Sequence, residues 1–169
     1  MIFSACTTEE LDYFTLREIA RVKDTCWKHG ISSQIKWMQE NCLADDLHIL
    51  MRADNESLAG YCTITKVCAQ FDQERTELCG LGGVCISHQL QGRGLGGILV
   101  NYATDLIHHG SKRGILLCRE GLVGFYGSHG WKNLKFDDAR VGDQPYGLRI
   151  MTTGGESKSC SSVLVDRNF

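Results

Sequence analysis

The sequence lacks several features that would assign it to other classes of protein. Its 169 residues contain no apolar run that approaches the ~20 residues needed to cross a bilayer, so we expect no membrane partner. Basic residues are not in excess, because 18 Lys and Arg oppose 20 Asp and Glu, and a nucleic-acid partner gains no electrostatic support. Repeats and low-complexity segments are also missing. With 43% hydrophobic residues, the chain is predicted to form one domain over residues 1–169.

The nine cysteines lack the patterns of a disulfide scaffold or a zinc site. Their number is odd, and no Cys-x-x-Cys pair occurs. Most lie in apolar stretches, where a reduced thiol packs as a small hydrophobic side chain. We therefore expect free core thiols, no metal site and a cytoplasmic location. For Cys85 and Cys118 the alternative is an acetyl-cysteine intermediate, but inert core thiols fit their apolar surroundings better.

The spacing of apolar residues predicts an alternation of helices and strands, which indicates a mixed α/β (α+β) domain. Ser32 and Ser33 are candidates for the N-cap of the second helix, and Gly110 is predicted to end the third. Gly80, Gly82 and Gly83 within one strand indicate a bulge or a place where the backbone of another molecule lies close. The expected helices cover residues 16–27, 32–42, 95–107 and 120–129, and the expected strands cover residues 47–52, 57–67, 75–86, 114–118, 131–136, 146–152 and 163–165.

Residues 92–97 (GRGLGG) form a glycine-dense turn that leads directly into a predicted helix. Free backbone N–H groups and the positive end of the helix dipole favour an anion at such a position. The segment also matches the Gly-x-Gly-x-x-Gly fingerprint of dinucleotide-binding domains, with Glu120 as the acidic partner. That context does not fit, because two helices and three strands precede the glycines and too few residues follow Glu120 for a second mononucleotide half.

Counted from Gln91, the same letters read Gln-x-x-Gly-x-Gly, with Gly94 and Gly96 as the glycines. Residues 116–131 (LLCREGLVGFYGSHGW) then give an apolar strand and a short helix that ends Phe-Tyr-x-x-x-Gly-Trp. In these two motifs the sequence resembles the GNAT superfamily of acetyl-coenzyme A-dependent N-acetyltransferases, above all the arylalkylamine and aminoglycoside 2′-acetyltransferases. The resemblance covers residues 80–131 and implies one domain with a mostly antiparallel mixed sheet. That sheet would be splayed around an acetyl-coenzyme A slot and flanked by helices.

The resemblance also implies roles for particular residues. Tyr126 would be the general acid that protonates the leaving thiolate. Glu77 is the first candidate for the base, since glycines and cysteines stand where the arylalkylamine enzymes have strand histidines. A second departure is Arg119, where many members have an asparagine. The backbone at the end of the bulged strand would pair with the pantetheine arm, and the loop would hold the pyrophosphate; these cofactor-binding residues are Val84, Cys85, Ile86, Gln91, Gly92, Arg93, Gly94, Leu95, Gly96 and Gly97.

The expected activity is transfer of an acetyl group from acetyl-coenzyme A to the primary amine of a small molecule. An aminoglycoside, with a role in antibiotic resistance, or a related polycationic amine ranks slightly ahead of an arylalkylamine or polyamine. Two alternatives stay open: a protein or peptide N-acetyltransferase, and a catalytically silent acyl-coenzyme A sensor. The protein is expected to be a monomer or a homodimer, and the N-terminal helices, the loop before Arg75 and the C-terminal strands are expected to select the acceptor.

Overall fold

The structure is a computed structural model that describes residues 1–110, 112–155 and 159–169. Its described residues fall into two compact units. Unit 1 comprises residues 1–65 and 82–103, and unit 2 comprises residues 66–81 and 104–169. Three elements run through both units, namely β3 (Leu58–Phe71), β4 (Glu74–Ile86) and α3 (Leu95–His109).

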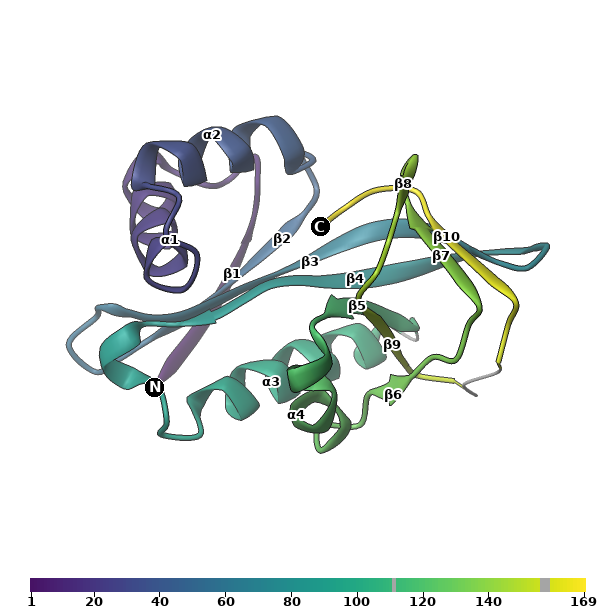
Figure 1. Ribbon diagram of the computed structural model, residues 1–169. Coiled ribbons are helices and arrows are strands. Elements are labelled where there is room, and N and C mark those ends of the chain that lie inside the picture. The colour runs from purple at the N-terminus through teal and green to yellow at the C-terminus, as the bar shows by residue number, and fades with distance from the viewer. Residues whose placement is uncertain (111, 156–158) are drawn as a thin grey trace. The chain divides into compact units, whose positions relative to one another are not determined.

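Unit 1 contains the N-terminal strands and helices. The strands β1 (Ile2–Thr7) and β2 (Leu47–Arg52) pair antiparallel, and β2 pairs antiparallel with the first half of β3. Between β1 and β2 the chain forms α1 (Tyr13–Cys26) and α2 (Ile31–Asn41), which lie side by side in Figure 1. The short 3₁₀ helix η1 (His88–Leu90) follows β4 and leads into the glycine loop.

The helices of unit 1 form because their apolar residues recur at helical spacing, and a side chain caps the start of α1. Leu16, Ile19 and Val22 of α1 are buried in one core cluster with Met38 of α2, and Leu50 and Leu58 contribute from the strands. The Asp12 carboxylate accepts hydrogen bonds from the first N–H groups of α1. The N-cap of α2 is Gly30 rather than Ser32 or Ser33, which lie inside the helix, so that prediction is wrong.

Unit 2 is a sheet with one short helix. It adds η2 (Glu120–Leu122) and α4 (Val123–Gly127) to the strands β5 (Gly114–Cys118), β6 (Lys132–Asn133), β7 (Asp138–Val141), β8 (Gln144–Pro145), β9 (Arg149–Thr153) and β10 (Ser162–Val165). Here β5 pairs parallel with β4 and antiparallel with β9, and β7 pairs parallel with β10; the other recorded pairs, β9 with β6, β10 with β3 and β7 with β8, are antiparallel. Ile115, Ile150 and Val163 lie in the core of this unit.

The mixed α/β class with a mostly antiparallel sheet is confirmed. The predicted strand 131–136 shortens to β6, and 146–152 starts later, at Arg149. Trp131 is buried and donates from Nε1 to the Thr104 hydroxyl at 3.0 Å. The residue is therefore held in the core, and β6 begins only after it, at Lys132. Three strands were not predicted at all: β1, β7 and β8. They are short and largely exposed, so they lack the alternating apolar pattern that marks a half-buried strand. No helix in the described part of the chain is long and apolar enough to span a membrane.

Candidate active site

The glycine loop of unit 1 has a backbone that only glycine adopts easily. Gly92 and Gly94 have φ values of +75° and +76°, in the left-handed region. A Cβ atom at either position would meet nothing within 4 Å, so the glycines are required by conformation and leave open space above the loop. The carbonyl of Gly94 accepts from the N–H groups of Gly97 at 3.1 Å and Ile98 at 3.4 Å, and this starts α3.

The same geometry gives the loop the features that favour an anion. The N–H groups of Leu95 and Gly96, in the first turn of α3, precede the first donors that the helix itself can satisfy. They lie at the positive end of the helix dipole, next to two glycines without side chains. Arg93, between these glycines, is exposed. A phosphate or pyrophosphate group is the ligand that such a loop favours.

Gln91 fixes this loop to the end of β4. Its side-chain Nε2 donates to the carbonyl of Ile86 at 3.0 Å. The strand end itself is ordered by the core of unit 1, since Cys85 and Ile86 are buried and Val84 is half-buried. Gly83, just before them, has φ +60°, which fits the predicted bulge. The structure thus brings together, in one unit, all ten residues predicted to bind the cofactor.

An additional thiol lies at this junction. The Sγ atom of Cys26, at the end of α1, is 3.6 Å from the Ile86 carbonyl oxygen and 3.6 Å from Gln91 Nε2. A side-chain hydrogen bond joins it to Cys85, and mainly because of this bond the pKa of Cys26 falls to about 6. Cys26 is a free thiol but it is exposed, so the expectation of a core position is wrong for this residue. No local pattern around Cys26 signals this, because its neighbours come from β4 and the glycine loop.

The two predicted catalytic residues lie in unit 2. Tyr126 is on α4 and is 8% exposed, and its ring packs edge-on against Phe125 with centroids 5.0 Å apart. The Tyr126 carbonyl accepts from the N–H groups of His129 and Trp131, which closes the turn after α4. Glu77 is an exposed residue of β4, next to the buried Leu78.

One of the strand glycines has a structural explanation within unit 2. A Cβ atom at Gly80 would lie 2.9 Å from the ring of Phe169, so the glycine gives room to that side chain. The close neighbour at Gly80 is therefore a side chain of the same chain and not the backbone of another molecule.

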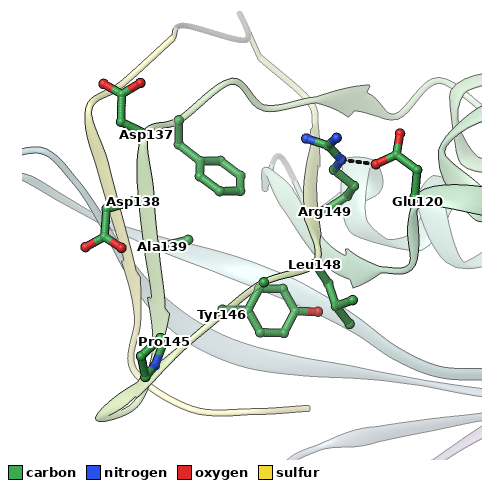
Figure 2. A pocket seen from close by; sticks show the side chains of 10 residues that line it. Glu120, Asp137, Asp138, Ala139, Pro145, Tyr146, Leu148 and Arg149 are labelled. Atoms are coloured by element: carbon green, nitrogen blue, oxygen red, sulfur yellow. Dashed lines mark hydrogen bonds and ion pairs between the residues drawn. The ribbon is translucent and has the colours of Figure 1, made fainter.

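A pocket of about 430 Å³ opens in unit 2 beside the end of β5 (Figure 2). Its lining includes Phe136, Tyr146 and Leu148, together with Glu120 and Arg149, which form an ion pair. Figure 2 shows the carboxylates of Asp137 and Asp138 directed away from the Tyr146 ring. Burial, helped by Cys118, raises the pKa of Tyr146 to about 12, so this hydroxyl stays protonated at neutral pH. No local sequence pattern indicates this pocket, because β7 and β8 were not predicted.

Comparison with known protein families identifies the family of this chain. The sequence model of the acetyltransferase (GNAT) family matches residues 11–131. The chain belongs to this family. No curated protein matches the GNAT chain at a significant level of sequence similarity. Among the described residues, no group of three or more His, Cys, Asp and Glu side chains is placed to hold a metal ion.

Solved structures agree with the family fold. ElaA from Escherichia coli has a TM-score of 0.66 at 20% identity, over 90% of this chain and 99% of that chain. An aminoglycoside 6′-N-acetyltransferase, solved with coenzyme A, has a TM-score of 0.65 at 13% identity, over 90% and 96%. A GNAT acetyltransferase from Brucella melitensis, solved with acetyl-coenzyme A, has a TM-score of 0.61 at 14% identity, over 96% and 94%. At these identities the likeness establishes the GNAT fold of this chain.

Proposed function

We propose that this GNAT chain is an enzyme that transfers the acetyl group of acetyl-coenzyme A directly to the primary amine of a small molecule. The observation that carries the proposal is the loop of unit 1. There, Gly92 and Gly94 hold the left-handed backbone, α3 begins with unsatisfied N–H groups, and Gln91 ties the loop to β4. The N–H groups from Gly92 to Gly97 would bind the pyrophosphate, and Arg93 would reach a phosphate oxygen.

The backbone of β4 is suited to the pantetheine arm. In the described part of the chain, β4 pairs with β5 only at Cys79 and Gly80. The residues that follow, Val84 to Ile86, would pair with the amides of the arm as an added strand does. The buried Cys85 and Ile86 side chains keep this backbone rigid, which lowers the entropy lost on binding.

The transfer itself needs two proton movements. The neutral amine attacks the thioester carbon, the C–S bond breaks, and the departing thiolate takes the hydroxyl proton of Tyr126. A free thiol has a pKa of about 8.5 and a tyrosine about 10, so the donation is slightly uphill and helps most in the transition state. The proton lost by the amine would go to Glu77 or to water.

The pocket of unit 2 suits an amine with an apolar body. Glu120, which lines the pocket, begins the η2–α4 segment that also contains Tyr126, so one short segment would contribute to both the amine pocket and the general acid. The rings of Phe136 and Tyr146 and the Leu148 side chain give apolar surface, whereas Glu120 is already paired with Arg149 and is a weak site for a second cation. We therefore place an arylalkylamine ahead of an aminoglycoside.

The test is release of free thiol from acetyl-coenzyme A in the presence of an amine panel. Phenethylamine and tryptamine represent aromatic amines, kanamycin and spermidine represent polycations, and peptides with a free N-terminus represent protein substrates. Turnover with the first pair supports the proposal, and turnover with peptides alone contradicts it. If calorimetry shows that acetyl-coenzyme A binds but no amine is acetylated, the chain is a sensor. The same titration with NADH tests the dinucleotide alternative.

A further inference from the structure

Two cysteines from distant parts of the sequence meet beside the proposed cofactor loop. Cys26 ends α1, and its Sγ atom lies 3.6 Å from the carbonyl oxygen of Ile86, the residue that follows Cys85 at the end of β4. The Cys85 side chain interacts with the Cys26 sulfur at this point. Cys26 is exposed, whereas Cys85 is only 3% exposed. The pair therefore consists of one thiol that is accessible to solvent and one that is buried.

The surroundings give the two thiols different charges at neutral pH. The hydrogen bond from Cys85 is the largest cause that lowers the pKa of Cys26 to about 6, with further bonds from Thr25, Ile86 and Gln91. The same bond, together with burial, raises the pKa of Cys85 well above its usual value, even though the Lys23 ammonium opposes this. Cys26 is then a thiolate and Cys85 a thiol that donates to it. An exposed thiolate next to a second cysteine is the arrangement of redox-sensitive sites.

We propose that Cys26 and Cys85 form an oxidation site, in which a peroxide converts the pair into an intramolecular disulfide. The Cys26 sulfur attacks one oxygen of hydrogen peroxide, the O–O bond breaks, and hydroxide leaves to become water, which gives a sulfenic acid. The Cys85 sulfur then attacks the Cys26 sulfur; the S–S bond forms, the S–O bond breaks, and the hydroxyl group leaves as water with the Cys85 proton. Two thiols have supplied two electrons, and one peroxide has become two waters.

The disulfide would act on the same residues that we propose for acetyl-coenzyme A. A disulfide brings its sulfurs to about 2.05 Å, closer than a hydrogen-bonded pair, so the two side chains and the contacts around them have to rearrange. Oxidation also removes the thiolate to which Gln91 Nε2 donates, while Gln91 is the residue that ties the glycine loop to Ile86. We therefore expect the oxidised protein to bind acetyl-coenzyme A more weakly. This consequence rests on the proposed function, whereas the oxidation chemistry does not.

The site itself is tested by mapping the disulfide. The reduced protein is treated with hydrogen peroxide, its remaining thiols are alkylated, and its peptides are identified by mass spectrometry. The expected product is a Cys26–Cys85 disulfide. Cys85→Ala should instead accumulate a sulfenic acid on Cys26 that dimedone traps, and Cys26→Ala should form neither. Cys118, buried in unit 2, is the internal control and should stay reduced. A disulfide from Cys26 to another cysteine such as Cys42, or oxidation of Cys26 at the same rate as Cys118, would overturn the proposal.

The consequence is tested by calorimetry with acetyl-coenzyme A before and after peroxide. Affinity is expected to fall by about 10-fold, a typical coupling between sites, and to recover with dithiothreitol. The affinity of Cys26→Ala should be the same before and after treatment. If the reduced wild type does not bind acetyl-coenzyme A, the proposed function fails, although the mapped disulfide still stands. If the disulfide forms and affinity is unchanged, the oxidation site stands and the effect on the cofactor is refuted.

Discussion

At the residue scale, Tyr126 differs from an ordinary core tyrosine only by the proton that it would give to the thiolate. Tyr126→Phe keeps the ring packed on Phe125 and removes the donor. We expect kcat to fall by about 10²-fold, the lower part of the range for general acids, because a thiolate also leaves unprotonated. KM for acetyl-coenzyme A should hardly change, since the interaction develops in the transition state.

A matched control exists in unit 1. Tyr102 is half-buried and stacks on Phe3 at 4.2 Å, so Tyr102→Phe makes the same chemical change in another aromatic contact. Its steady-state rates should equal those of the wild type. Equal kcat for Tyr126→Phe and Tyr102→Phe over the whole pH range would show that Tyr126 is a packing residue.

Cys26 also has a protonation state that can be measured directly. Because its pKa is lowered to about 6, its alkylation by iodoacetamide should reach half of its maximal rate near that pH, with the thiolate dominant above it. Cys85→Ala removes the largest cause, so the midpoint should move up toward the ordinary thiol value. Unchanged midpoints in the two proteins would mean that the two thiols do not interact.

At the scale of elements, we propose that the glycine loop and the start of α3 together bind the pyrophosphate. Gly94→Glu puts a carboxylate into the proposed pyrophosphate site at a φ of +76°. We expect acetyl-coenzyme A binding to weaken by about 100-fold, since the loss of about 3 kcal/mol of charge-assisted hydrogen bonds corresponds to that factor. Calorimetry measures the affinity, and thermal unfolding measures the accompanying backbone strain.

Gly30→Glu serves as the comparison for that strain. Gly30 lies in unit 1 with φ +87°, and a Cβ atom there also meets nothing within 4 Å. Both variants should lose similar stability, because both force a side chain onto a left-handed backbone. Gly30→Glu should bind acetyl-coenzyme A with an affinity close to that of the wild type, whereas Gly94→Glu should not. Equal affinities in the two variants would reject the loop as the cofactor site.

At the scale of the whole molecule, stability depends on a buried histidine in unit 1. His48 is fully buried, with Nδ1 2.8 Å from the Tyr61 hydroxyl and Nε2 2.8 Å from the Thr8 hydroxyl. Burial is the main reason that its pKa falls to about 4; the nearby Lys23 ammonium lowers it further, whereas Asp46 opposes the shift. The folded protein thus holds His48 neutral at a pH where the unfolded chain binds a proton.

The sign of the pH effect follows from that difference. An unfolded histidine titrates near pH 6.5, so stability should be complete above that value and fall as pH decreases toward 4. The loss in the free energy of unfolding should approach about 3 kcal/mol, because the pKa of His48 is roughly two and a half lower in the folded than in the unfolded protein. Urea unfolding at a series of pH values measures it. His48→Gln keeps a polar side chain without the titration, and its slope in this window should be smaller; the same slope would exclude His48 as the source.

The sequence by itself determined the elements whose cause is local. The bounds of β5, an apolar run, were predicted to the residue. The start of α3 was also predicted, because a glycine-dense turn before an apolar helix is a local feature of the sequence. The family motifs lie in these same segments, so the residues of the proposed cofactor loop can be named from the sequence, and their binding role stays a prediction. A positive φ and an apolar face are properties of a few consecutive residues, and they need no distant partner.

Only the tertiary structure decided which distant residues meet. Short exposed strands such as β1 and β7 are stabilised by pairing with neighbours, so their own sequences do not mark them. The same reason explains the pocket around Tyr146, the approach of Phe169 to Gly80 and the meeting of Cys26 with Cys85. In each case the contact joins residues that are far apart in the sequence. Only the folding of the whole chain brings them within reach of one another.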